Sequence, residues 1–370
     1  MMNTAEDVIY LALCAVNQKV PDSERIHAMD LDEVYSIASH HMIAATIAFA
    51  LESAGFKDKR SANAIASAMR KTAIFEKAWG EIRQNLEDAH IWYMPLKGAL
   101  LKEMYPKYGM REFSDHDILF DESRAGDVKA IMEKLGFSSK RFGYGNNDAY
   151  HKAPCLNFEM HRTLFGARHD EKLYEYYKNV EERLLHGTGY ERSFSSEDFY
   201  IYFLAHEYKH FAGGGTGLRS LLDTWVYLNH MTLDEEYVAR EVGKLGIADF
   251  EKQNRSLSLH LFDGKELTES DREMLDYILS SGTFGTIQHK VENEMSKKGW
   301  GKTHYALSRF FVPVSKKDKY YDIYAGLYPF FYKHKIFLPF LPFYRTFRAL
   351  KSGKLKAELN ALKDADKEKA

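Results

Sequence analysis

The spacing of apolar residues changes near residue 91, and this change restricts the fold more than any other feature of the sequence. From Lys59 to Ala89, apolar residues recur at the spacing of an α-helix. Beyond it come short β-prone runs, which are IWYMP, DHDILF and stretches around 137–142 and 154–165, with a turn predicted at GYGNND. Helical spacing returns after residue 170. We therefore predict an α+β fold, in which a small mixed β-sheet module is embedded in a predominantly helical protein.

The same pattern predicts four parts of the chain. These are an N-terminal helical region (1–90), an α/β core (91–168), a helical domain (169–320), and an aromatic and basic C-terminal segment with a charged helical tail (321–370). A content of 45% apolar and 28% charged residues is typical of a chain that buries a core.

Cysteine content and charge exclude several classes of protein. Only Cys14 and Cys155 are present, which excludes a disulfide-framed secreted domain and a cysteine-rich zinc module. The 51 Lys and Arg residues nearly balance the 53 Asp and Glu residues, which argues against a protein that coats nucleic acid. We find no signal-peptide pattern and no uncharged apolar run long enough to span a bilayer. We therefore expect a cytoplasmic protein without a transmembrane segment.

Two carboxylates lie two residues apart in the predicted strand DHDILF. Alternation along a strand places Asp115 and Asp117 on one face and His116 on the other. Neighbouring carboxylates repel each other unless a cation lies between them, and Mg²⁺ (or Mn²⁺) prefers oxygen ligands. Glu159, in a later predicted strand, would complete a cluster of three carboxylates.

Candidate phosphate-binding residues lie upstream of this strand. Lys97 and Gly98 open a short predicted helix after the first strand, where backbone N–H groups can face an anion. Arg111 and Ser114 add further donors. Carboxylates for a metal ion and donors for phosphates are what phosphoryl or nucleotidyl transfer requires.

The order of these motifs resembles the uncharacterised nucleotidyltransferase family of the DNA polymerase beta superfamily. The matching runs are PLKGALLKEMYPKYGMREFSDHDILF, LGF, NFEMH and, in the helical half, AHEYKHF followed by LRSLLD. On this resemblance, Lys97-Gly98 corresponds to the family's turn, Asp115 and Asp117 to its metal-binding pair, and Glu159 with His161 to its third-carboxylate strand. His161 would orient Glu159 or contact the nucleotide, and a structural role is an equal alternative.

The resemblance implies a nucleotidyltransferase-type core and a metal-dependent activity. A nucleoside triphosphate would be the substrate, NMP would be transferred to an acceptor, and pyrophosphate would leave. The acceptor is not readable from the sequence, so a small molecule, a sugar, an RNA end and a protein hydroxyl all stay open. A catalytically inactive nucleotide-binding or scaffold protein is one alternative.

A second alternative is a zinc metallopeptidase, because residues 206–210 read HEYKH. On a helix this motif places His206 and His210 one turn apart beside Glu207. The extended motif requires a third histidine, and that position is Thr216. We therefore favour structural or acceptor-side roles for His206 and His210, with Asp223 as a candidate partner.

Residues 324–350 interleave Tyr, Phe, Leu and Pro with Lys, His and Arg. This composition suits either packing against the protein or contact with a membrane surface. The three prolines argue against one continuous amphipathic helix, so we favour packing over peripheral membrane contact.

Overall fold

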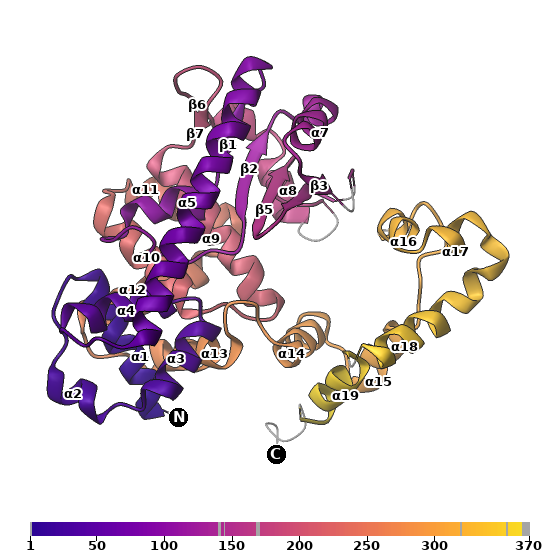
Figure 1. Cartoon of the computed structure of the whole chain (residues 1–370). Coiled ribbons are helices and arrows are strands. Elements are labelled where there is room, and N and C mark those ends of the chain that lie inside the picture. The colour runs from indigo at the N-terminus through magenta and orange to yellow at the C-terminus, as the bar shows by residue number, and fades with distance from the viewer. Residues whose placement is uncertain are drawn as a thin grey trace.

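The computed structural model describes residues 2–364 except 140–141, 144, 168–170, 319 and 353. The fold is α+β, as predicted: one five-stranded mixed sheet and a two-stranded ribbon lie among many helices (Figure 1).

Five helices precede the sheet, with bounds α1 (Met2–Val16), α2 (Ser23–Ala28), α3 (Leu31–His40), α4 (Ala44–Ser53) and α5 (Lys59–Asp88). Aspartate side chains cap three of them, since Asp22, Asp30 and Asp58 accept hydrogen bonds from N–H groups of the first turns of α2, α3 and α5.

The sheet has the strand order β1-β2-β5-β4-β3. Its strands are β1 (Tyr93–Pro95), β2 (His116–Phe120), β3 (Ser138–Ser139), β4 (Asn147–Lys152) and β5 (Leu156–His161). The connections are α6 (Gly98–Leu101) with η1 (Lys102–Met104), and η2 (Glu122–Arg124) with α7 (Ala125–Lys134). Strands β2 and β5 are parallel, and the other neighbours are antiparallel.

Strand β4 was not predicted from the sequence. Residues 147 and 148 fall in the stretch that we assigned to a turn, because NDAYHK is polar and lacks β-branched residues. Asp148 is nevertheless buried, and its carboxylate accepts a hydrogen bond from the backbone N–H of Gly143. Pairing with β5 therefore overrides the weak local preference.

Alternation along β2 separates two environments. Ile118 and Phe120 pack in an apolar cluster with Phe75 of α5 and Met132 of α7, whereas Leu119 belongs to the large cluster formed with the other helices. The sheet is thus covered on both faces, and odd-numbered residues of β2 face the second, larger helical layer.

This larger layer combines helices from both sides of the sheet in the sequence. Its later members are α8 (Glu171–Tyr177), η3 (Val180–Arg183), α9 (Ser196–Gly213), α10 (Leu218–His230), α11 (Glu235–Leu245), α12 (Ala248–Asp263) and α13 (Glu269–Ser281), with the ribbon β6 (Leu185–His186) and β7 (Arg192–Ser193). Leu11 of α1 and Leu51 of α4 share one apolar cluster with Leu204, Leu222 and Leu257.

The C-terminal helices extend away from this body (Figure 1). They are α14 (Ile287–Lys298), α15 (Lys302–Ser308), α16 (Tyr321–Leu327), α17 (Pro329–Lys333), η4 (Lys335–Phe340), α18 (Leu341–Lys351) and α19 (Lys354–Asp364). Helix α14 packs against α9 and α19. The predicted charged tail corresponds to α19, and residues 365–370 lie outside the described part of the chain. Among the described residues, no helix has the length and apolar character needed to cross a membrane.

Candidate active site

Strand pairing brings the predicted carboxylates together. Asp117 of β2 lies directly opposite Glu159 of β5 in the parallel register. Since neighbours in register share a face, both side chains lie on the side of the sheet that faces the helical layer. His116 lies on the opposite face, as predicted, and its ring packs against those of Phe113 and Phe158.

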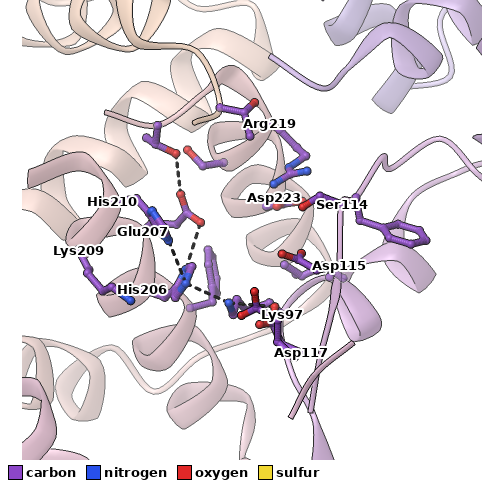
Figure 2. Close-up of a pocket in the computed structure, with 18 of the residues that line it drawn as sticks. Lys97, Ser114, Asp115, Asp117, His206, Glu207, Lys209, His210, Arg219 and Asp223 are labelled. Carbon is purple, nitrogen blue, oxygen red and sulfur yellow. Dashed lines mark hydrogen bonds and ion pairs between the residues drawn. The ribbon is translucent and has the colours of Figure 1, made fainter. Parts of the chain in front are cut away.

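Of the predicted pair Asp115 and Asp117, only Asp117 lies in a strand. Strand β2 begins at His116, so Asp115 belongs to the loop that precedes it. Asp115 still lines the same pocket, on the side of Asp117 and Lys97 (Figure 2).

Asp117, Glu159 and His161 form a group that fits a divalent cation. One ligand atom from each side chain lies within 4.8 Å of the others. His161 Nε2 donates a hydrogen bond of 2.8 Å to Asp117 Oδ1. The side chain of Asn147, on the unpredicted strand β4, donates to Glu159. Two carboxylates and one imidazole are ligands that both Mg²⁺ and Mn²⁺ accept, with oxygen preferred.

The two carboxylates have opposite pKa shifts. Burial alone would raise the pKa of Asp117, but the Lys97 ammonium and the hydrogen bond from His161 hold that pKa well below its usual range. Burial and the negative charge of Asp117 raise the pKa of Glu159. The site therefore holds one firmly ionised carboxylate beside a second whose ionisation a bound cation would favour.

Lys97 lies where a cation would be expected. Its Nζ is 2.9 Å from Asp117 Oδ2 and donates a 3.0 Å hydrogen bond to His206 Nε2. The backbone of Lys97 has φ +41°, a region that residues other than glycine seldom adopt. Such a backbone strain at the start of α6 is typical of a residue held in place by its surroundings.

The HEYKH motif lies on α9, and its His206, Glu207 and His210 lie across the pocket from Lys97 and Asp117 (Figure 2). His206 and His210 are close, with 3.1 Å between their Nε2 atoms. Burial and the charge of Lys97 lower the pKa of His206, which favours the neutral ring that accepts from Lys97. Glu207 accepts a hydrogen bond from Thr216. Among the described residues, neither histidine belongs to a group of three ligating side chains, so the zinc-peptidase alternative lacks a third ligand.

Arg111 is bound by Asp223, which the sequence analysis named as a candidate partner of His206 and His210. Its Nε and Nη2 each donate a 2.7 Å hydrogen bond to the carboxylate of Asp223, which also accepts from the Tyr105 hydroxyl. Asp223 is therefore not the partner of His206 or His210. Arg111 also explains Gly98, because a Cβ at that position would collide with the guanidinium group.

These side chains line one pocket of about 410 Å³. Lys97, Gly98, Arg111, Ser114, Asp115, Asp117, Glu159, His161, His206 and His210 all contribute to its wall, so the structure brings the predicted site residues together. An adjoining groove shares Lys209 and His210 with the pocket and adds Lys290 and Lys297.

The sequence analysis missed Arg219, which also lines the pocket. Its Nη1 donates to the backbone carbonyl of Glu112, and among the described residues it makes no ion pair with a carboxylate. Burial and the neighbouring Arg111 lower the pKa of Arg219. Arg219 precedes Asp223 by one helical turn, so the spacing within LRSLLD could have indicated that both face the site.

Comparison with known proteins gives one match. A family model described as uncharacterised nucleotidyltransferase matches residues 27–263, which is well over half of the chain. The matched interval contains the whole five-stranded sheet and the pocket residues on α9 and α10. No curated protein and no solved structure matches the chain.

Proposed function

The chain belongs to this family of uncharacterised nucleotidyltransferases, and on that premise we propose that it transfers NMP from a nucleoside triphosphate to an acceptor hydroxyl at the pocket beside β2. The acceptor oxygen bonds to the α-phosphorus, the bond from this phosphorus to the bridging oxygen breaks, and pyrophosphate leaves. The observation that carries the proposal is the adjacency of Asp117 and Glu159, in register on two parallel strands, inside a pocket that Lys97, Arg111 and Arg219 also line.

We assign the divalent cation, Mg²⁺ or Mn²⁺, to Asp117 and Glu159, with Asp115 as a third carboxylate at the same wall. When bound, such an ion neutralises phosphate charge and makes an acceptor hydroxyl more acidic. His161 holds one oxygen of Asp117 through its hydrogen bond and so orients the other towards the pocket.

Positive charge for the triphosphate would come from Lys97 and Arg219. A cation at Asp117 would compete with the Lys97 ammonium, which would then be available to a phosphate oxygen. Arg219 has guanidinium donors in the pocket without a paired carboxylate among the described residues. Asp223 already neutralises the Arg111 guanidinium, so Arg111 adds no net positive charge to the pocket. Its guanidinium instead packs rigidly against Gly98.

The direct test is transfer of label from each of the four NTPs, labelled at the α-phosphate. The protein is incubated with Mg²⁺ or Mn²⁺ and separate pools of small molecules, sugars, RNA and protein, and pyrophosphate release is followed in parallel. Asp117→Asn keeps the size of the side chain but removes the charge. We expect it to lower transfer by at least about a hundredfold while the protein stays folded.

Glu122→Gln is the matched control, because Glu122 is an exposed carboxylate outside the pocket. It should retain wild-type transfer. Full activity of Asp117→Asn would contradict the proposed mechanism. Tight NTP binding with no pyrophosphate release in any of the pools would instead identify an inactive nucleotide-binding protein.

A further inference from the structure

Large apolar side chains are exposed along residues 330–350, which we call the aromatic arm. The arm comprises most of α17, all of η4 and most of α18. The exposed residues are Phe330, Ile336, Phe337, Phe340, Phe343, Tyr344, Phe347 and Leu350. Sequence analysis favoured packing against the protein for this segment. The structure does not bury these side chains, since only Tyr332, Leu338 and Leu341 of the arm are buried.

Helix α18 has its apolar face turned outward. Phe343, Phe347 and Leu350 follow one another at spacings of four and three residues, which places them on one face of the helix. Phe340 lies three residues before Phe343. Their exposed fractions are 66%, 67% and 59% for the three α18 residues, whereas Leu341 on the inner side is fully buried. A solvent-facing helix surface normally carries polar residues, so this face requires a partner.

Charge identifies the kind of partner. Residues 330–350 include four Lys and Arg residues and no Asp or Glu, although the whole protein has a net charge of −2. Lys333, Lys335 and Arg348 are exposed among the apolar residues. A surface that is both apolar and strongly basic is complementary to an anionic lipid bilayer, where rings enter the boundary region and cations meet phosphates.

We propose that the aromatic arm is a docking surface for anionic lipid membranes. The arm is divided into short helices, with Pro339 inside η4 and Pro342 in the first turn of α18, so it offers several short apolar faces that can lie along a membrane surface. This mode needs no membrane-spanning helix. Helices α17 and α18 lie away from strand β2 and helix α9, which line the pocket (Figure 1), so the proposal does not depend on the transferase activity.

The test is flotation of the full-length protein with vesicles of phosphatidylcholine alone or mixed with phosphatidylglycerol. We expect binding to the mixed vesicles that weakens as salt is raised, and much weaker binding to phosphatidylcholine alone. Phe343→Ser combined with Phe347→Ser should lower vesicle affinity at least about tenfold. Lys333→Glu with Lys335→Glu should abolish the preference for anionic lipid.

Leu185→Ser is the control, because Leu185 is exposed in β6 on the other part of the molecule. It should bind vesicles as wild type does, and thermal unfolding should show that all variants fold. Three outcomes would overturn the proposal. They are no binding to the mixed vesicles, equal binding to both vesicle types, and a concentration-dependent dimer that the Phe343→Ser, Phe347→Ser variant abolishes while vesicle binding is unchanged.

Discussion

At the scale of single residues, Lys97 is the positively charged group that contacts both sides of the pocket. Its ammonium neutralises Asp117 at 2.9 Å and contacts His206 at 3.0 Å, so it bridges the sheet and α9. An ammonium group and a divalent cation compete for the same carboxylate oxygen. We therefore propose that Lys97 pairs with Asp117 before a cation binds and with a phosphate oxygen afterwards.

Lys97→Met tests this exchange. The substitution removes the competing charge, so the affinity for Mn²⁺ measured by calorimetry should rise. The same variant should raise the KM for NTP about tenfold to a hundredfold, the loss expected for one charged hydrogen bond. Lys129→Met, at an exposed ion pair with Glu133, is the control. Unchanged Mn²⁺ affinity together with unchanged KM would show that Lys97 has neither role.

The site residues differ in how far the sequence could predict them. Asp117 and Glu159 were predictable because each lies in a run that reads as a strand, and Lys97 because it flanks a glycine at a strand-to-helix turn. The bond of Asp223 to Arg111 was not predictable, because it joins residues 112 positions apart whose contact exists only in the folded chain. Arg219 could have been indicated only by its spacing of one helical turn from Asp223, and such spacing alone does not separate a pocket residue from a surface one.

At the scale of elements, long and strongly patterned segments were predicted well. The helical spacing that returns after residue 170 corresponds to a series of helices that includes α9 and α10. The predicted strand at 115–120 corresponds to β2, one residue shorter. Strand β4 was missed because its residues have low β-propensity and are ordered by β5, a tertiary effect that local pattern does not contain.

We predict that His41 makes the packing of three helices sensitive to pH. His41 directly follows α3, and its ring accepts a hydrogen bond from the N–H of Leu218 at the start of α10. The ring also makes a hydrogen bond with the backbone of Leu279 in α13. Burial, helped by the neighbouring His40, lowers the pKa of His41 from 6.5 to about 4. Protonation would remove the acceptor that Leu218 uses.

The sign of the effect follows from the lowered pKa. Below pH 6.5, His41 is protonated in the unfolded chain but stays neutral in the folded protein. The free energy of unfolding that neutral His41 contributes is therefore complete above pH 6.5 and is lost as the pH falls towards 4. We expect this loss of unfolding free energy to be roughly 3 kcal/mol. In urea titrations, His41→Gln should reduce the decline in unfolding free energy over this range. A decline as steep as in the wild type would contradict the assignment.

At the scale of the whole molecule, the chain has a large body and a lightly attached C-terminal part. The large apolar cluster ends at Ile278, and the C-terminal helices rely on two small clusters, around Tyr332 and around Tyr305. Few apolar contacts mean a low free energy of local opening. The body that holds the pocket and the arm that we assign to lipid are therefore separately stabilised.

Limited trypsin digestion of the full-length protein should first cut this C-terminal part. Lys316 and Lys317 are exposed in a stretch, 311–318, that has neither helix nor strand. Intact-mass analysis should therefore find an early fragment that ends at one of these lysines. An early cut within the sheet, at 93–161, would contradict the separate stability of the body.

The most direct test of the central claim is anomalous diffraction from crystals soaked with Mn²⁺ and a non-hydrolysable NTP analogue. The account predicts a manganese peak bounded by the carboxylates of Asp117 and Glu159, with the triphosphate beside it and the Lys97 ammonium moved from Asp117 to a phosphate oxygen. A peak at His206 and His210 instead, or a triphosphate bound away from β2, would contradict it.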